Sequence, residues 1–415
     1  MKDTRQPWFK DAKYGLFIHW GLYSILAGEY NGVKTDRIAE WIENHLDIPV
    51  EDYRRLAARF NPSAFDADEL VRRAKEDWGM RYIVITAKHH EGFAMYDSRA
   101  SRFNVVQATP YGRDILMQLR RACDKYGMRL GVYYSQAQDW DDPDGYVQYR
   151  DNSRKDFQRY FDSKCVPQVR ELLENYGPLS LIWFDTPMGI TEAQSRKLVD
   201  LVKSIQPDCL LSGRTGNGMG DYMTCGDNAL PRLPYDGDWE LPATVNDTWG
   251  YNQFDHNWKS PDDILRTLLK VVSRGGNYLL NVGPTAEGVV PGACAQVLDE
   301  VGRYVRDNGE AIYATRAVGL YPFEVPGIEM TRKPHRLFIH VLSPKRRIEL
   351  LNIGNHFVGA HLVRDHRPLS VRTYHTCEGD SMVEVDLPEA LQAQKNYCVC
   401  LEMEEEAPVF EPIRD

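Results

Sequence analysis

Polar and aromatic side chains that can bind a ligand follow several short apolar runs of this sequence. Each stands at or next to the carboxyl end of its run; the set is His19, Trp20, Lys88, His89, His90, Glu91, Tyr133, Tyr134, Ser135, Trp183, Asp185, Ser212 and Arg214. Aromatic faces pack well on apolar ring surfaces, and hydroxyl groups need donors and acceptors. These residue types together indicate a carbohydrate as the leading ligand class.

Asp185 ends the apolar run at residues 179–184 and is the first candidate for a reacting group. A carboxylate at the mouth of a barrel can attack an anomeric carbon, and a second carboxyl group about 5–5.5 Å away then serves as acid and base. Alternatively, Asp185 caps a helix that begins near Pro187. The second carboxyl stays open, because the sequence does not fix the reach of loops; the candidates are Glu40, Glu91, Asp221, Asp227 and Glu240.

The elements that must position these side chains follow from the apolar pattern. Six runs indicate buried parallel strands, at residues 16–20, 81–88, 129–135, 179–185, 208–214 and 277–283. Amphipathic helix patterns fill the gaps, at residues 66–78, 114–126, 153–176, 191–205, 261–273 and 292–308. Weaker strand patterns near Tyr222 and at residues 239–246 complete eight. With no GxGxxG after the first strand and no GxxxxGK[ST], the prediction is a (β/α)8-like barrel, whose strand ends form the site.

The pattern changes after about residue 316. Short alternating segments follow, at residues 337–342, 348–353, 357–363, 371–375, 382–387 and 397–403. They predict a C-terminal antiparallel β-sandwich. We therefore expect a catalytic (β/α) barrel domain at residues 1–315 and a sandwich domain at residues 316–415, the second bracing the first rather than binding glycan.

Composition excludes several partner classes. The 415 residues carry a net charge of -10, which argues against nucleic acid or an anionic lipid surface. No apolar run is long enough to span a membrane, and the first residues lack the apolar core of a signal peptide. The eight cysteines include no CxxC pair. The expectation is a cytoplasmic protein with reduced thiols, or a secreted or periplasmic one if a leader was removed.

A metal site at His89 and His90, with His19 and Asp185 as further ligands, is a weaker hypothesis. Adjacent residues on a strand point to opposite faces, and the sequence has no HxH, HExxH or CxxC spacing. We therefore expect neither a metal nor another cofactor. A metal-dependent barrel hydrolase is the corresponding alternative function.

A series of motifs in a fixed order resembles the α-L-fucosidases of glycoside hydrolase family 29. The motifs are Trp8-Phe9, residues 14–24 (YGLFIHWGLYS), Glu40-Trp41, Phe65-Asp66, residues 87–93 (AKHHEGF), Arg113-Asp114, residues 131–135 (GVYYS), Trp183-Phe184-Asp185, residues 247–251 (DTWGY), residues 277–284 (NYLLNVGP) and residues 309–313 (GEAIY). The resemblance covers essentially residues 8–315.

The resemblance implies a barrel with a C-terminal sandwich. It also implies hydrolysis of terminal α-L-fucose from oligosaccharides or glycoconjugates, with retention of configuration through a covalent fucosyl-enzyme. Asp185 is then the nucleophile, and Tyr134 positions it. The implied substrate-binding set is His19, Glu40, Trp41, His89, His90, Tyr134, Trp183 and Arg214. The resemblance does not define the preferred glycosidic linkage or the oligomeric state, and a homo-oligomer is one possible state.

The acid/base departs from the family pattern. The segment at residues 221–228 reads DYMTCGDN, so the matching carboxyl is Asp227, where many members have Glu. Glu240 is the second choice, and Glu40 and Asp221 follow. An Asp in this turn can also be structural. The departure leaves one further alternative, a catalytically impaired fucose-binding relative or a glycosidase of altered specificity.

Overall fold

Eight parallel strands form the sheet that carries the polar residues described above. The computed structural model describes residues 6–231, 235–319 and 325–411. The strands are β1 (Tyr14–Ile18), β4 (Tyr82–Lys88), β5 (Arg129–Ser135), β6 (Leu181–Asp185), β7 (Leu210–Leu211), β8 (Met223–Thr224), β9 (Trp239–Thr244) and β10 (Asn277–Val282). Their order around the curled sheet is β7-β6-β5-β4-β1-β10-β9-β8. The (β/α)8-like barrel is therefore confirmed; β7 and β8, at the two ends of this order, pair with β6 and β9 but not with each other.

The gap between β7 and β8 is bridged by the backbone just before β8. Asp221 N donates to Leu211 O at 2.8 Å, and the Asp221 carboxylate accepts from Leu211 N at 2.8 Å. β7 and β8 have two residues each, which explains why the sequence pattern near Tyr222 was weak.

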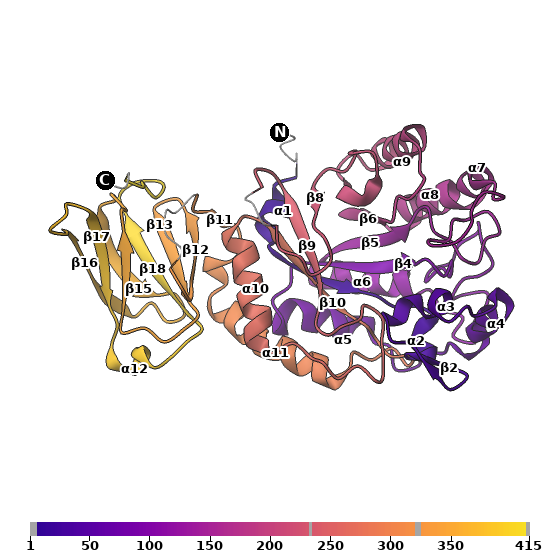
Figure 1. Cartoon of the computed structure of the whole chain (residues 1–415), viewed down its shortest axis with the longest axis horizontal. Coiled ribbons are helices and arrows are strands. Elements are labelled where there is room, and N and C mark those ends of the chain that lie inside the picture. The colour runs from indigo at the N-terminus through magenta and orange to yellow at the C-terminus, as the bar shows by residue number, and fades with distance from the viewer. Residues whose placement is uncertain (1–5, 232–234, 320–324, 412–415) are drawn as a thin grey trace.

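Helices cover the outer face of this sheet (Figure 1). They are α5 (Ala67–Arg72), α6 (Ile115–Tyr126), α7 (Phe157–Tyr160), α8 (Val166–Asn175), α9 (Glu192–Ile205), α10 (Pro261–Ser273) and α11 (Gly292–Asp307). Side-chain caps fix several starts: Asp114 accepts from Met117 N, and Thr191 forms a capping box with Gln194. The helix expected at residues 153–176 is divided, because a π-helical segment, Phe161–Cys165, separates α7 from α8.

Short elements before β4 build one side of the barrel mouth. They are α2 (Tyr23–Leu26), β2 (Glu29–Tyr30), β3 (Val33–Lys34), α3 (Ile42–His45) and α4 (Val50–Arg55). Helix α1 (Pro7–Ala12) lies instead at the amino ends of the strands, where Asn277 Nδ2 of β10 donates to Phe9 O at 2.8 Å. Two apolar clusters hold the barrel together. One lies between the sheet and the helices, and the other fills the barrel interior with residues such as Phe17, Tyr133 and Trp183. Successive residues of a strand point alternately into these two clusters, and only those that face the barrel interior can reach the site.

The C-terminal strands form an antiparallel sandwich beside α10 and α11 (Figure 1). They are β11 (Arg316–Ala317), β12 (Ile328–Lys333), β13 (Arg336–Val341), β14 (Arg347–Leu351), β15 (Phe357–Leu362), β16 (Pro368–His375), β17 (Ser381–Asp386) and β18 (Tyr397–Met403), with α12 (Glu389–Gln392) between the last two. β16 pairs with β15 at its start and with β17 farther along, so it joins the two layers. The predicted sandwich is confirmed; the boundary at residue 315 stays a prediction.

Hydrogen bonds join the sandwich to the outer helices of the barrel. Arg266 of α10 donates to Leu342 O at 2.7 Å, and Tyr304 of α11 lies 2.7 Å from His340 Nδ1. This packing supports the expectation that the sandwich braces the barrel. None of the helices in residues 6–231, 235–319 and 325–411 is long and apolar enough to cross a membrane. The start of the chain, on which the signal-peptide argument depends, includes residues 1–5, which lie outside the described residues.

Candidate active site

A pocket of about 140 Å³ opens at the carboxyl ends of the parallel strands. Its lining brings together residues from distant parts of the chain: Phe17, His19, Ile38, Glu40, Trp41, His89, His90, Tyr133, Trp183, Asp185, Thr186, Arg214, Asp227 and Trp249. All the predicted site residues except Tyr134 and Glu240 are among them. The structure thus brings most of the side chains that the sequence analysis singled out into one cavity.

Asp185 is held in the pocket by three hydrogen bonds. Its carboxylate accepts from Tyr133 Oη at 2.8 Å and from Arg214 Nη1 at 2.9 Å, and its backbone N donates to Gln136 Oε1 at 2.8 Å. Burial alone would raise the pKa of Asp185, but the positive charge of Arg214 and these hydrogen bonds outweigh it, and the pKa is lowered. Asp185 is therefore ionised at neutral pH. It does not cap a helix, because α9 is capped by Thr191.

Arg214 joins Asp185 to a second carboxylate. Its Nη1 bonds Asp185, and its Nη2 bonds both Asp227 and, at 3.2 Å, the carbonyl of Cys225. The guanidinium lies 4.8 Å from the centre of the Trp183 ring. The side chain of Asp185 is 10% exposed and that of Asp227 is 45% exposed, so the first lies inside the pocket and the second at its rim.

Three histidines form one wall of the pocket, and burial lowers the pKa of each, to about 4 for His19. His19 Nδ1 donates to Asn281 Oδ1 at 2.7 Å, and His90 Nδ1 donates to Ser135 Oγ at 2.7 Å. All three rings are therefore neutral at pH 7. In His19 and His90 the bare Nε2 is left to accept a hydrogen bond, whereas His89 Nδ1 has no partner in the described part of the chain.

Glu40 supplies a further unused oxygen. Its Oε2 accepts from Gly250 N at 2.9 Å and from Thr248 Oγ1 at 3.2 Å, while its buried Oε1 has no hydrogen-bond partner among the residues described. Burial raises the pKa of Glu40 to about 7, against the lowering effect of those hydrogen bonds. Buried polar atoms without partners are rare in proteins. Glu40 Oε1 and His89 Nδ1 thus indicate where a polar ligand binds.

Tyr134 was expected in this pocket, and that prediction is wrong. Its hydroxyl donates to Gln168 Oε1 at 2.8 Å in the layer between the sheet and helix α8. Successive residues of a strand face opposite sides, so the neighbouring Tyr133 faces the barrel interior and bonds Asp185 instead. Tyr133 shares its face with Ser135, the partner of His90. Strict alternation back from Ser135 could have identified Tyr133.

The pocket also contains residues outside the implied substrate-binding set: Phe17, Ile38, Tyr133, Thr186 and Trp249, of which the sequence analysis named only Tyr133, as a polar residue at a strand end. Phe17 and Tyr133 lie on strands, where alternation is an available signal. Ile38 and Trp249 come from loops after β3 and β9, and Thr186 directly follows Asp185. Only the packing of the loops places these three at the pocket.

Glu240 lies below the pocket, inside the barrel. It accepts hydrogen bonds from Tyr82 Oη at 2.6 Å, Trp183 Nε1 at 2.8 Å and Tyr222 Oη at 3.3 Å. Burial raises the pKa of Glu240 to about 7, although these bonds oppose the rise. Glu240 stands near the start of β9 and does not line the pocket, so it holds the underside of Trp183 and cannot contact a leaving group there.

Asp221 and Glu91, the other two alternatives for the acid, form hydrogen bonds or ion pairs outside the pocket. Asp221 pairs with Lys203 at 2.8 Å and binds the backbone of β7. Glu91 accepts from Leu22 N at 3.2 Å and from the Tyr53 hydroxyl. Neither lines the pocket. Of the carboxyl groups considered, Glu40, Asp185 and Asp227 line it.

No group of three or more His, Cys, Asp or Glu side chains that could hold a metal ion occurs in the described residues. In two of the histidines, His19 and His90, the Nδ1–H group donates a hydrogen bond to a protein acceptor. The third, His89, lies with its ring centre 4.1 Å from that of His90. The three rings therefore form a set of hydrogen-bonding groups.

A buried ion cluster supports the strand end that carries His89 and His90. Asp139 bonds Lys88 Nζ at 2.8 Å and Lys164 Nζ at 2.9 Å, and all three side chains are buried. Burial would raise the pKa of Asp139, but the two ammonium groups outweigh it and the pKa is lowered. The next residue, Trp140, donates its backbone N–H to His90 O at 2.7 Å. The cluster thus fixes the loop against the site.

Replacement of Asp139 by Ala is expected to lower the free energy of unfolding by about 3–5 kcal/mol, because it leaves buried Lys88 without its counter-charge and Lys164 with only the Asp141 carboxylate, 3.7 Å away. The lowered pKa means that the contribution of ionised Asp139 is present above the ordinary Asp range and is lost as the pH falls through the lowered value. Urea unfolding at pH 7 measures the change, with Asp200→Ala on the exposed face of α9 as the control. A loss below about 1 kcal/mol would contradict a structural role for the cluster.

The chain is similar to known proteins over most of its length. A family model described as "Alpha-L-fucosidase" matches residues 1–310. The tissue alpha-L-fucosidase of Rattus norvegicus is 30% identical in an alignment 330 positions long that covers 74% of this chain and 70% of that protein. The residues matched by the family model include every residue of the pocket.

Solved structures extend the similarity to the whole fold. The α-L-fucosidase of Vibrio sp. strain EJY3 has a TM-score of 0.88 and 34% identity, covering 96% of this chain and 72% of that one. The α-L-fucosidase AlfC of Lactobacillus casei, in complex with its α-L-fucose product, has 43% identity and a TM-score of 0.68, covering 73% of this chain and 99% of that one.

Proposed function

This chain belongs to the α-L-fucosidase family, and we propose that it hydrolyses terminal α-L-fucose from fucosylated glycans with retention of configuration. The observation that carries the proposal is the single guanidinium of Arg214, which joins ionised Asp185 inside the pocket to Asp227 at its rim. A retaining glycosidase needs two neighbouring carboxyl groups, one as nucleophile and one as acid and then base.

The first step forms a covalent intermediate. Asp185 attacks the anomeric carbon, the bond from that carbon to the glycosidic oxygen breaks, and Asp227, in its protonated form, donates its carboxyl proton to the departing oxygen and becomes a carboxylate. Tyr133 and Arg214 hold the attacking carboxylate and keep it ionised. In the second step Asp227 takes a proton from water, and the resulting hydroxide releases fucose from Asp185.

The remaining pocket groups suit the hydroxyls and ring of the sugar. The bare Nε2 atoms of His19 and His90, with Nδ1 of His89 and Oε1 of Glu40, offer four hydrogen-bonding positions. Trp183 forms part of the aromatic lining. Holding the sugar at several points converts the attack into an intramolecular reaction.

The alternative of a catalytically impaired relative depended on the unusual segment around Asp227. In the structure this segment still brings a carboxylate to Arg214 and to the pocket rim. Assays of 4-nitrophenyl α-L-fucoside and of a fucosylated oligosaccharide test the proposed function. Turnover of both is expected; turnover of neither would overturn it.

Substitution of Glu40 by Gln is expected to lower kcat/KM by roughly 10–100-fold, because a hydrogen bond to a charged group contributes about 1.5–3 kcal/mol. Gln keeps the shape and the contact with Gly250 N but loses the charge. The pKa of about 7 adds a pH test: the ionised carboxylate is the stronger acceptor, so inhibition by free fucose should tighten as the pH rises through 7.

The pH test is read by comparing fucose inhibition constants of the wild type and Glu40→Gln from about pH 5.5 to about pH 8.5. The wild-type constant should fall with pH and the variant's should stay flat. Glu51→Gln, an exposed change on α4, serves as the matched control. Parallel curves for wild type and Glu40→Gln would contradict a sugar contact at Glu40.

A further inference from the structure

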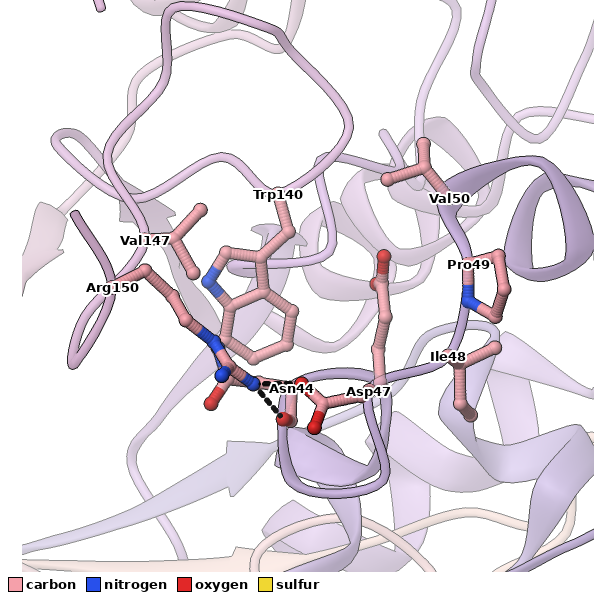
Figure 2. Close-up of a pocket in the computed structure, with 9 residues that line it drawn as sticks. Asn44, Asp47, Ile48, Pro49, Val50, Trp140, Val147 and Arg150 are labelled. Atoms are coloured by element: carbon pink, nitrogen blue, oxygen red, sulfur yellow. Dashed lines mark hydrogen bonds and ion pairs between the residues drawn. The ribbon is translucent and has the colours of Figure 1, made fainter. Parts of the chain in front are cut away.

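A second cavity, of about 240 Å³, is shown in Figure 2. It adjoins the active-site pocket, because its Trp140 packs against Trp41 and His90 of that pocket. It is lined by Glu43, Asn44, Asp47, Ile48, Pro49, Val50, Trp140, Val147 and Arg150. These residues belong to the α3–α4 region and to the loop after β5. The cavity is larger than the pocket proposed for fucose, so it has room for another sugar ring.

Two tryptophans separate the cavity from the active site. Trp140 lines the cavity and Trp41 lines the active-site pocket, and their ring centres are 5.2 Å apart in an edge-to-face contact. Trp140 also lies 5.5 Å from the ring of His90. A glycan whose terminal fucose occupies the inner pocket therefore needs to extend only past this pair to enter the cavity.

The walls of the cavity offer an aromatic ring and apolar side chains. Figure 2 shows Trp140 between Val147 on one side and Pro49 and Val50 on the other. At the edge, Arg150 Nη2 donates to Asn44 O at 3.0 Å and pairs with Asp47. The charge of Arg150 is thus already neutralised by the protein.

Glu43 supplies a buried polar atom without a protein partner. The residue is 5% exposed, and its Oε2 makes no hydrogen bond within the described ranges. Burial raises the pKa of Glu43 well above the usual range, and the nearby carboxylates Glu91, Asp141 and Asp139 raise it further. Glu43 is therefore protonated at neutral pH, and a neutral carboxyl can donate its hydrogen to a ligand oxygen.

We propose that this cavity binds a neutral pyranose of the leaving-group glycan, with the sugar packed against Trp140 and hydrogen-bonded to Glu43. The inference rests on the proposed function and adds to it the chemical class of the leaving group. Aromatic and apolar walls with a few polar groups are the usual lining of a sugar or small-molecule site. The only cation among the described lining residues, Arg150, is already paired with Asp47, so the cavity offers no free positive charge to attract an anionic sugar.

A comparison of two substrates distinguishes sugar binding in the cavity from catalysis in the inner pocket. α-L-Fucosyl fluoride has no leaving-group sugar, so its hydrolysis reports on the inner pocket alone. The second substrate is an oligosaccharide, either 2′-fucosyllactose or fucosyl-α-1,6-N-acetylglucosamine. The one that the wild type cleaves faster is used. The quantity measured is the ratio of kcat/KM for the oligosaccharide to kcat/KM for the fluoride, because binding of the remote sugar favours only the former.

Two variants address the cavity in different ways. Glu43→Met keeps the length of the side chain and removes the hydrogen bond; because the polar group has no protein partner, the fold should tolerate the change. Val147→Trp fills the cavity from its half-buried wall. Matched controls are Glu51→Met on the exposed face of α4 and Val358→Trp on the exposed face of β15.

The ratio should fall about tenfold in Glu43→Met and at least as much in Val147→Trp, and it should stay at the wild-type value in both controls. Ratios within twofold of wild type in both cavity variants, with the fluoride still hydrolysed, would overturn the cavity proposal alone. A wild type that hydrolyses neither substrate would overturn the proposed function, and the cavity proposal would fall with it.

Discussion

Replacement of Asp185 by Ala should reduce kcat on 4-nitrophenyl α-L-fucoside by at least about 10⁴-fold, while the protein still folds. The loss is large because no other group in the pocket replaces the attacking atom, and removal of a covalent nucleophile costs nearly the whole chemical advantage. Arg214 keeps its pair with Asp227 in the variant, so its charge retains a partner. Circular dichroism and thermal unfolding confirm the fold.

Azide distinguishes a lost nucleophile from a damaged site. In Asp185→Ala the small anion can enter the vacated space, attack the anomeric carbon and release nitrophenol as fucosyl azide forms. Rate recovery with azide in this variant, and none in the Asp200→Ala control, is the expected result. Wild-type turnover by Asp185→Ala would show that another group is the nucleophile.

The second large effect depends on the leaving group. Replacement of Asp227 by Ala should lower kcat/KM on a fucosylated oligosaccharide by roughly 10²–10⁴-fold, the usual contribution of a general acid. The same variant should lose far less in the first step on 4-nitrophenyl α-L-fucoside, because nitrophenolate departs without a proton. Rates of both substrates with wild type and variant give the comparison directly.

Glu240→Ala is the control that distinguishes a general acid from a residue that only supports the pocket wall. Glu240 accepts the Trp183 indole N–H below the pocket, so its loss should disturb the sugar-binding wall and lower the rates on both substrates by similar factors. A leaving-group-dependent loss in Glu240→Ala, with none in Asp227→Ala, would assign the acid to Glu240 and contradict the geometry.

The sequence predicted the parts of this site that strands position. The apolar run before Asp185 continues to the barrel mouth in β6, and His89 and His90 follow β4 as expected. Tyr134 was assigned to the pocket from the motif resemblance, and the structure places its neighbour on β5, Tyr133, there instead. A one-residue error on a strand moves the side chain to the opposite face of the sheet.

Contacts between residues far apart in the chain determine the positions of the other site residues. Glu240 was a plausible acid because it follows a tryptophan on a strand, but its place near the start of β9 puts it beneath Trp183. Trp249 reaches the pocket because the loop after β9 folds back: Asn281 of β10 donates to Trp249 O at 2.7 Å. Such contacts join residues far apart in the chain, and local periodicity does not contain them.

The stereochemistry of the first product tests the central claim most directly. Proton NMR during the first minutes of α-L-fucosyl fluoride or aryl fucoside hydrolysis identifies the anomer released before mutarotation. The two-carboxylate arrangement of Asp185 and Asp227 around Arg214 predicts that α-L-fucose forms first, by two successive inversions. If β-L-fucose forms first, water attacks the substrate directly, and Asp185 is not a covalent nucleophile.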